Sequence, residues 1–203
     1  MLLKKIILLV VGFTMIGSGV GILRIIDLGI DPFGAMLLGV SDFVNLSFGT
    51  LMMISQMLFL ALTIWKRKDL VGVGSVIAMF GIGYLIDFSY EMLSRFIQVD
   101  FPFLLSLVIL ALTLIVMSFG VSLIIVANLG LVPYDGLGFV IEDISKGTFK
   151  FKWNRMATDG FAALVAFFLG APVGIATFMT VFMLGPFVNF FKGVVSKAMG
   201  LNI

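Results

Sequence analysis

The chain of 203 residues contains no cysteine and no histidine. The lack of cysteine excludes disulfides and thiolate chemistry, and the lack of histidine removes the commonest general base and the commonest transition-metal ligand. Charged residues are also scarce, at 12% of the sequence, and the net charge is only +2. We therefore expect no enzyme, no cofactor and no metal site, and so small a charge gives no reason to expect nucleic-acid binding.

Hydrophobic residues are what the chain has in abundance. They make up 61% of the sequence, and the mean hydropathy is +1.23, which is typical of an integral membrane protein. Six segments are long enough to cross a bilayer as helices. The predicted spans cover residues 6–28, 50–65, 70–94, 102–127, 151–169 and 172–191. The first span resembles a signal peptide, but no small-residue cleavage site interrupts it, so we expect it to be retained.

A short motif follows the first and the fourth predicted span. Residues 28–34 (LGIDPFG) return 101 positions later within residues 129–136 (LGLVPYDG). A proline directly after an apolar run stops a helix, and it can open a new helix at that helix's first position. Gly29 and Gly130 suit the left-handed turn that closes many helices. Each copy of the motif therefore predicts a break in the chain followed by a short helix.

The motif belongs to a longer internal repeat. Matching pairs at offsets of 101 or 102 include Gly19/Gly120, Asp27/Asn128, Phe33/Tyr134, Gly72/Gly174, Ser75/Thr177 and Asp87/Asn189. Because each copy contains three crossings, the two copies have opposite orientations in the membrane. The sequence predicts an all-α membrane protein of six transmembrane helices in an inverted 3+3 repeat, with halves at 1–100 and 101–203. Each half has a short re-entrant or interfacial helix after its first span, at 32–46 and 133–145.

Lysine and arginine are distributed unevenly among the predicted loops. With the N-terminus inside, only Arg24 and Arg95 fall at the outer side, and the other basic residues lie in or beside the cytoplasm. Because basic residues accumulate on the cytoplasmic side, we expect both termini to be cytoplasmic. If the two short helices also crossed, the basic cluster at 66–68 would face outward, so the charge distribution argues against eight spans.

Several of these positions are shared with a known family. The matching parts are Gly19 to Pro32, Phe48-Gly49-Thr50, residues 72–75, Arg155 with Asp159, and Gly174 to Pro186. Over nearly its whole length the chain resembles the YczE-like bacterial membrane proteins, which are related to the YyaS and YitT groups. The resemblance implies a multi-pass protein of the bacterial plasma membrane with an uncharacterised activity, and it implies no substrate.

Ionisable residues within the predicted spans are the candidates for function. Arg155 and Asp159 are four residues apart in the fifth span, so they share a helix face and can pair. An unpaired charge at that depth costs roughly 3 kcal/mol or more. Two interpretations stay open, namely a structural ion pair and a role in handling a substrate or proton. Arg24 and Asp27 share a face near the outer end of the first span, where anchoring at the interface is the simpler interpretation.

The predicted site centres on the two breaks and the charged fifth span. If the short helices enter from opposite faces, their N-terminal dipole ends favour an anionic or zwitterionic ligand group. The residues expected near the pathway are Asp31, Pro32, Asn128, Pro133, Asp135, Arg155 and Asp159. Secondary candidates are Asp27, Gln56, Asp87, Asn154 and Asn189. The acid-to-amide matches between the halves suit an asymmetric ion pathway, but drift between duplicated halves would also produce them.

We expect a small secondary transporter or channel for a small polar or ionic solute. The alternative is a membrane-embedded binding or regulatory subunit that moves no solute by itself. The expected partners are the lipid bilayer and the solute, which the sequence does not name. Association with a second copy or with another membrane protein stays open.

Overall fold

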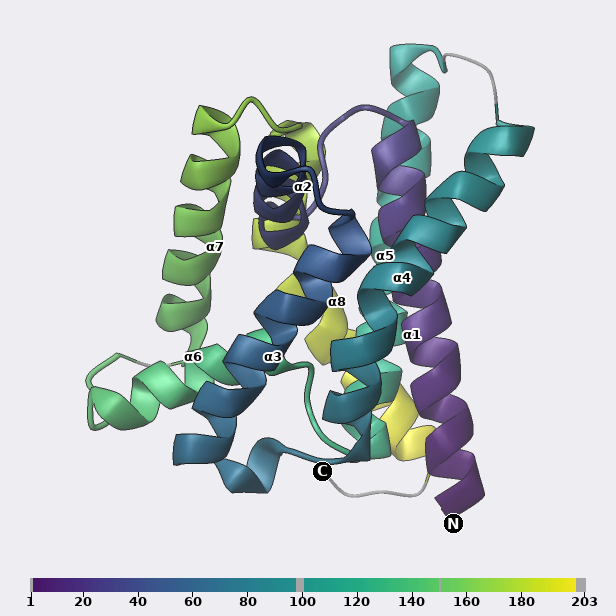
Figure 1. Ribbon diagram of the computed structural model, residues 1–203. Helices are drawn as coiled ribbons and strands as arrows, with labels where there is room; N and C mark the ends of the chain where they lie inside the picture. The colour runs from purple at the N-terminus through teal and green to yellow at the C-terminus, as the bar shows by residue number, and fades with distance from the viewer. Residues whose placement is uncertain (1, 98–100, 150, 200–203) are drawn as a thin grey trace. The chain divides into compact units, whose positions relative to one another are not determined.

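Helices are the regular structure of the computed structural model, which describes residues 2–97, 101–149 and 151–199 (Figure 1). The α-helices in this part of the chain are α1 (Leu2–Ile25), α2 (Pro32–Val44), α3 (Phe48–Lys66), α4 (Val73–Phe96), α5 (Phe103–Ala127), α6 (Pro133–Ile144), α7 (Phe151–Phe168) and α8 (Ile175–Ala198). A short 3-10 helix, η1 (Lys68–Leu70), precedes α4. The order of one long, one short and two long helices occurs twice.

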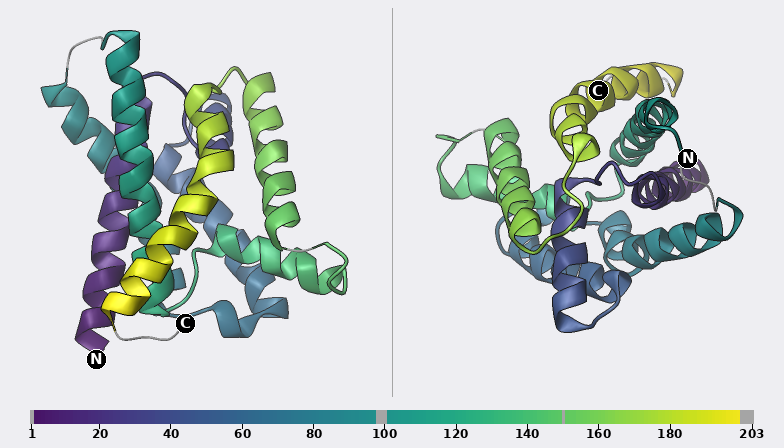
Figure 2. Two further views of the ribbon diagram at one scale, coloured as in Figure 1. Left: turned by 180° about the vertical axis from the view of Figure 1, so that it is seen from behind. Right: turned by 90° about the horizontal axis from the view of Figure 1, so that it is seen from above.

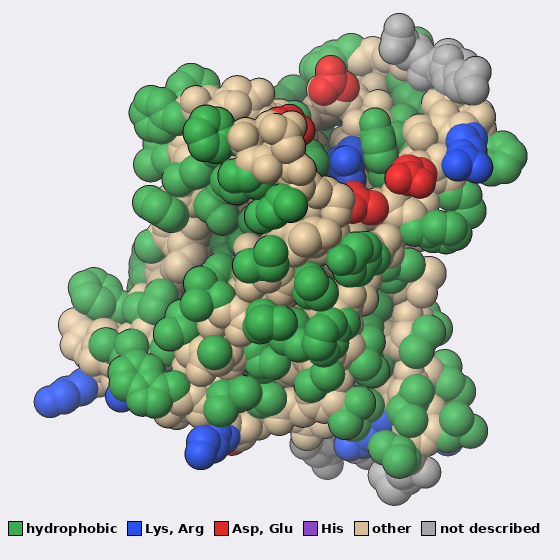
Figure 3. Space-filling view, viewed as in Figure 1, with side chains coloured by type: hydrophobic (Ala, Val, Ile, Leu, Met, Phe, Trp, Pro, Cys, Tyr) green, Lys and Arg blue, Asp and Glu red, His purple; other side chains and the backbone are tan. Residues whose placement is uncertain are grey.

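Five of the helices, α1, α3, α4, α5 and α8, are long and apolar enough to cross a membrane. The fifth predicted span, α7, falls outside this set because its 18 residues include Lys152, Arg155 and Asp159. Hydrophobic side chains cover much more of the face seen in Figure 3 than charged side chains do. The all-helical membrane class is therefore confirmed, whereas the count of six spans stays a prediction.

The two short helices begin at the prolines that predicted them. α2 starts at Pro32 and α6 at Pro133, where the fixed φ of proline suits the first turn and its missing N–H needs no partner. The largest difference from the predicted boundaries is at α8, which runs through Pro186 to Ala198, whereas the predicted span ends at residue 191. A proline within a helix removes one backbone hydrogen bond, and the remaining bonds carry α8 beyond its apolar run.

Contacts divide the chain into two compact units, and each unit contains segments from both predicted halves. Unit 1 comprises Met1–Asp31, Leu85–Asn128 and Pro172–Ile203, and unit 2 comprises Pro32–Tyr84 and Leu129–Ala171. The helix α4 is shared, because the division falls between Tyr84 and Leu85. The halves at 1–100 and 101–203 are defined by the sequence repeat and not by compactness, and they stay a prediction.

In unit 1, α5 packs between α1 and α8, and these helices lie side by side in both views of Figure 2. Gly12 lies against the backbone of Gly120, whereas Gly19 lies against Met117 and Thr113. Because the contacts on α5 move toward lower numbers as those on α1 rise, the two helices are antiparallel. Glycine at these contacts allows the backbones to approach closely, as is common between helices in lipid.

The break between α1 and α2 is closed by hydrogen bonds within unit 1. The N–H of Ile30 donates to the carbonyl of Pro172 at 3.3 Å, and the N–H of Ala176 donates to the carbonyl of Leu28 at 2.8 Å. The backbone that leaves α1 is therefore paired with the segment that enters α8. This pairing satisfies polar groups that no helix satisfies.

The break between α5 and α6 is closed in the same way within unit 2. The N–H of Leu131 donates to the carbonyl of Leu70 at 3.0 Å, and the N–H of Gly74 donates to the carbonyl of Leu129 at 2.7 Å. The hydroxyl of Ser75 adds a third bond, to the carbonyl of Leu131, at 2.6 Å. This break is therefore paired with the segment that enters α4.

Positive φ angles occur at matching places in the two breaks. Gly29 has φ 88° and Gly130 has φ 110°, as the turn prediction required. Asp27 and Asn128 also lie in the left-handed region, at φ 52° and 49°, and Asn128 is the C-cap of α5. Aspartate and asparagine tolerate this conformation better than most residues, so the acid-to-amide match has a structural explanation.

The spacing predicted that Arg24 and Asp27 share one helix face, but only Arg24 lies within α1. Arg24 instead donates from Nη1 to the carboxylate of Asp87 on α4 at 2.9 Å, and its guanidinium lies 4.2 Å from the ring centre of Tyr90. The prediction was wrong because α1 ends at Ile25. Asp27 lies in the left-handed turn beyond the helix, where helical spacing no longer applies.

We expect the substitution Gly72→Ala to destabilise the protein. The added Cβ would lie 2.7 Å from the carbonyl carbon of Leu129, whose oxygen accepts the bond from Gly74. Overpacking of this kind costs about 1–3 kcal/mol. Gly81→Ala is the matched control, because nothing lies within 4 Å of its Cβ position and alanine favours the helix. Thermal unfolding of the purified variants measures the difference, and an unchanged melting temperature for Gly72→Ala would contradict the close approach.

Candidate functional site

Four side chains of unit 2 form a polar network where α6 begins. α6 supplies Tyr134 and Asp135, and α7 supplies Arg155 and Asp159. The hydroxyl of Tyr134 donates to Oδ1 of Asp159 at 2.7 Å, and Nε of Arg155 donates to Oδ2 of Asp159 at 3.1 Å. Nη1 of Arg155 donates to Oδ1 of Asp135. Asp159 is only 9% exposed, so the network holds a buried charge with partners on both carboxylate oxygens.

Local sequence explains why these groups converge. Pro133 opens α6, which places Tyr134 and Asp135 in the first turn, where backbone N–H groups and the helix dipole favour a carboxylate. Arg155 and Asp159 are four residues apart on α7, so they face the same side of that helix. The predicted pairing of these two residues is confirmed by the ion pair.

Aromatic rings surround the network on the side of α2 and α3. The ring of Tyr134 stacks on that of Phe33, with centres 4.1 Å apart and planes within 9° of parallel. Phe59 is tilted against both rings at 5.7 Å, and the guanidinium of Arg155 lies 4.4 Å from the Tyr134 ring centre. The first turns of α2 and α6 therefore meet through two residues that match in the sequence repeat.

Two buried amides connect the network to the surrounding helices. The backbone N–H of Tyr134 donates to Oε1 of Gln56 on α3 at 3.0 Å, and Gln56 is 2% exposed. Asn154 on α7 donates to the carbonyls of Gly138 at 3.1 Å and Phe149 at 2.9 Å. Gln56 and Asn154 therefore both bond to a neighbouring helix, and both amides hold α6 in place.

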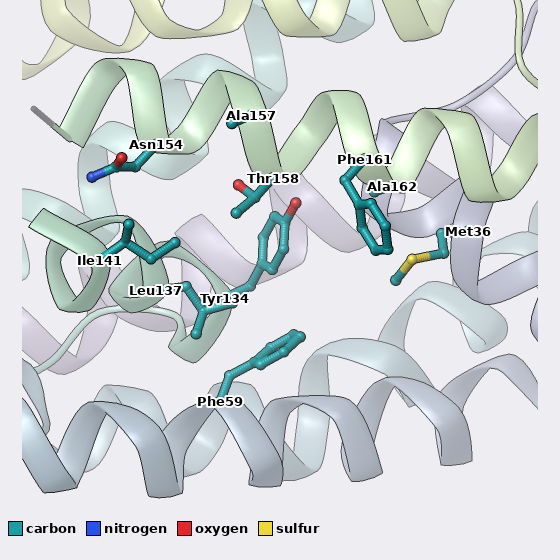
Figure 4. A pocket seen from close by; sticks show the side chains of 10 residues that line it. All are labelled: Met36, Phe59, Tyr134, Leu137, Ile141, Asn154, Ala157, Thr158, Phe161 and Ala162. Atoms are coloured by element: carbon teal, nitrogen blue, oxygen red, sulfur yellow. The ribbon is translucent and has the colours of Figure 1, made fainter. Parts of the chain in front are cut away.

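A cavity of about 360 Å³ lies beside Tyr134 (Figure 4). Its walls come from α2, α3, α6 and α7, and they include Met36, Phe59, Tyr134, Leu137, Thr158 and Phe161. Figure 4 shows the Tyr134 hydroxyl directed toward α7 near Thr158, with Phe59 on the opposite side. The cavity is therefore mainly apolar and has a few polar groups near the buried carboxylate.

The charges of the network do not cancel. When all groups are ionised, Asp135 and Asp159 contribute two negative charges and Arg155 one positive charge, which leaves one negative charge in excess. This arrangement can hold a proton or a cationic group. Within the described ranges, no group of three or more aspartate, glutamate, histidine or cysteine residues could hold a metal ion.

The predicted pathway residues fall in both units. Pro133, Asp135, Arg155 and Asp159 belong to the network or adjoin it, and Pro32 precedes Phe33 of the ring stack. Asp31 and Asn128 belong to unit 1. Among the secondary candidates, Gln56 and Asn154 support α6, whereas Asp27, Asp87 and Asn189 belong to unit 1.

The sequence interpretation missed the aromatic members of this site. Tyr134 was recognised only as the repeat match of Phe33, although it contributes both a ring and the hydroxyl that reaches Asp159. The tyrosine beside Pro133, in place of phenylalanine beside Pro32, was the available signal. Nothing in the sequence distinguished Phe59 or Thr158 from the many other side chains of their helices.

The comparisons with known proteins place the chain among uncharacterised relatives. Residues 3–193 match a family of unknown function (DUF6198). The uncharacterized protein YyaS of Bacillus subtilis (strain 168) is 26% identical over 189 residues, which cover 92% of each chain. The uncharacterized membrane protein YczE of the same organism is 24% identical over 163 residues, covering 80% of this chain and 73% of YczE. No solved structure matches the chain.

We expect Tyr134→Phe and Asp159→Asn to have coupled effects on stability. Tyr134→Phe keeps the ring stack and removes the hydroxyl, and a hydrogen bond to a charged group contributes about 1.5–3 kcal/mol. Once Asp159→Asn has removed the charge, the second substitution should cost clearly less. Thermal unfolding of both single variants and the double variant gives the coupling energy. Strictly additive effects would contradict a charge-assisted hydrogen bond between Tyr134 and Asp159.

Proposed function

We propose a transport function for this chain. The chain belongs to the DUF6198 family of unknown function. Its similarity to YyaS and YczE confirms the predicted resemblance to the YczE-like proteins. The chain is a multi-pass membrane protein. In our proposal it lies in the bacterial plasma membrane and acts as a small secondary transporter or channel for a small polar or ionic solute. The observation that carries this proposal is the buried network around Asp159 beside a cavity.

Ionisable groups buried in membrane helices are costly, and they commonly mark solute or proton pathways. The network has the further property that Arg155 contacts two acids, one on α6 and one on its own helix. A solute that takes over one acid leaves the arginine paired with the other. We therefore assign Asp135, Arg155 and Asp159 to the pathway, together with Pro32 and Pro133 at the starts of α2 and α6.

We propose that the helices form the inverted 3+3 repeat predicted from the sequence. Within unit 1, the contact of Gly12 with Gly120 has its counterpart in the contact of Gly19 with Thr113, since each member shifts by 101 residues. The antiparallel direction of α1 and α5 fits halves of opposite orientation. The hydrogen bonds at the two breaks also correspond, with Ile30 to Pro172 matching Leu131 to Leu70. Such pairs are expected of a pseudo-twofold axis.

In this proposal α7 is the sixth crossing, and α2 and α6 are re-entrant. Arg155 and Asp159 of α7 are compatible with a span because Arg155 pairs with both Asp159 and Asp135, which reduces the cost of burial. The stack of Phe33 on Tyr134 brings the starts of the two short helices together. Helices lying flat in opposite interfaces would not meet at their first turns.

The competing function is a membrane-embedded binding or regulatory subunit that moves no solute. The observation that favours it is that the cavity and the network both lie within unit 2, so binding requires no continuous pathway. An enzyme is the weakest candidate, since the sequence has neither histidine nor cysteine.

The predicted orientation is tested with single cysteines, because the chain has none of its own. In intact cells we expect Phe96→Cys at the end of α4 to react with a membrane-impermeant maleimide. Lys68→Cys before α4 should react only after permeabilisation, because the basic cluster at 66–68 lies inside. Labelling of both positions from the same side would exclude α4 as a crossing helix. The last four residues lie outside the described part, so the C-terminus needs its own tag.

We expect Asp159→Asn to impair solute flux without preventing membrane insertion. Asparagine keeps an oxygen that can accept the Tyr134 hydroxyl but removes the charge, so flux should fall by about tenfold or more. Flux is measured in proteoliposomes of the purified protein, with potassium, ammonium, acetate and phenethylamine as probe solutes. Asp143→Asn is the matched control, because Asp143 is an exposed acid of α6 near Arg67. Full flux through Asp159→Asn would assign that residue a structural role.

A further inference from the structure

We propose that the cavity beside Tyr134 binds a small organic amine. The apolar body of the amine would lie against Phe59 and Phe161, and its charged nitrogen would meet the Tyr134 hydroxyl that bonds Asp159. The inference rests on the proposed function only where the amine is taken as the transported solute. Binding itself is measured without flux.

The walls of the cavity favour a ligand with an apolar body over a bare ion. Its volume of about 360 Å³ is within the range of about 300–1,000 Å³ that is common for small-molecule sites. Met36, Phe59, Leu137 and Phe161 contribute apolar surface. An inorganic cation that gives up its water requires oxygen ligands on several sides, which walls of this kind do not offer.

The polar groups of the cavity favour a ligand that donates hydrogen bonds. The Tyr134 hydroxyl already donates to Asp159, and the Thr158 hydroxyl donates to the carbonyl of Arg155 at 2.9 Å. The amide nitrogen of Asn154 donates to two backbone carbonyls. All three donors are therefore in use, and their oxygens remain as acceptors. An ammonium group supplies three donors and no acceptor, so it complements this set.

Charge and aromatic surface both favour a cation. The network has one negative charge in excess, and the Tyr134 hydroxyl joins it to the cavity. The rings of Phe59, Tyr134 and Phe161 line the space, and an ammonium near their faces gains a cation–π interaction. If the nitrogen takes a share of Asp159, Arg155 keeps its pair with Asp135, so no charge is left unpaired.

The cavity can be reached from the exposed face of α7. Phe161 lines the cavity and is 66% exposed, and Ala157 beside it is also exposed. In Figure 4 the side chains of Met36 and Phe161 border the cavity at the end away from Asn154. An amine with an apolar body can therefore enter along α7 and place its nitrogen near Thr158.

The experiment compares ligands that share one apolar body and differ in the head group. Phenethylamine, phenethyl alcohol, hydrocinnamate and ammonium chloride are titrated into the purified protein in one detergent, and affinity is obtained by calorimetry. We expect phenethylamine to bind about tenfold or more tighter than phenethyl alcohol, since a charge-assisted bond replaces a neutral one. Hydrocinnamate should bind more weakly than the alcohol, and ammonium should show no binding at the same concentrations.

Two pairs of variants locate the site. Asp159→Asn should bring the amine and the alcohol to similar affinities, whereas Asp143→Asn should keep the tenfold difference. Ala157→Leu narrows the cavity and should weaken all ligands, whereas Ala163→Leu on the same helix, outside the lining, should not. The second pair decides the question if Asp159→Asn does not fold.

The outcomes separate this inference from the proposed function. Selective amine binding without flux supports the inference and favours the binding-subunit alternative. Flux of an ion without amine binding overturns the inference and leaves the transport proposal standing. Equal affinities for amine and alcohol, or amine binding that survives both Asp159→Asn and Ala157→Leu, also overturn it.

Discussion

The constraint on which the structure depends is the hydrogen bonding of the two breaks. Each break exposes backbone N–H and carbonyl groups, and in a bilayer such groups need partners within the protein. The break after α1 obtains them from the segment entering α8, and the break after α5 from the segment entering α4. Glycine is needed where these backbones touch, at Gly72 and Gly174. Because each break is paired with the last helix of the other predicted half, neither compact unit coincides with a half of the sequence.

Features set by local chemistry were predictable from the sequence. Pro32 and Pro133 have no N–H to continue a helix, so the breaks and the starts of α2 and α6 follow from the chain itself. The spacing of Arg155 and Asp159 fixes their shared face on α7, and the pair forms. The order of one long, one short and two long helices occurs twice, which is compatible with the repeat that the glycine and proline matches predict. All of these inferences concern residues within a few turns of one another or a direct comparison of two stretches.

Contacts between elements far apart in the chain could not be predicted from the sequence. Arg24 on α1 pairs with Asp87 on α4. Asp27 lies beyond the end of α1, so it does not share a helix face with Arg24. The hydroxyl of Tyr134 on α6 donates to Asp159 on α7, and no spacing rule connects these positions. For the match of Asp27 with Asn128, the sequence left open an asymmetric ion pathway and drift between the halves, and both residues occupy left-handed turns that these residue types tolerate. Conformation accounts for that match without any role in transport.

The difference between the halves at the ring stack has a physical reason. In the proposed inverted repeat, Phe33 and Tyr134 occupy equivalent places and touch each other, and Gly34 is equivalent to Asp135. If the first half also had an aspartate, at position 34, two carboxylates would lie close together in a poorly solvated place. Their mutual repulsion and their burial would disfavour ionisation. With Phe33 and Gly34 in the first half, only the second half contributes a carboxylate here, and the surface opposite it is apolar. A site beside such an axis can therefore hold a single charge against an aromatic wall only if the two halves have diverged there.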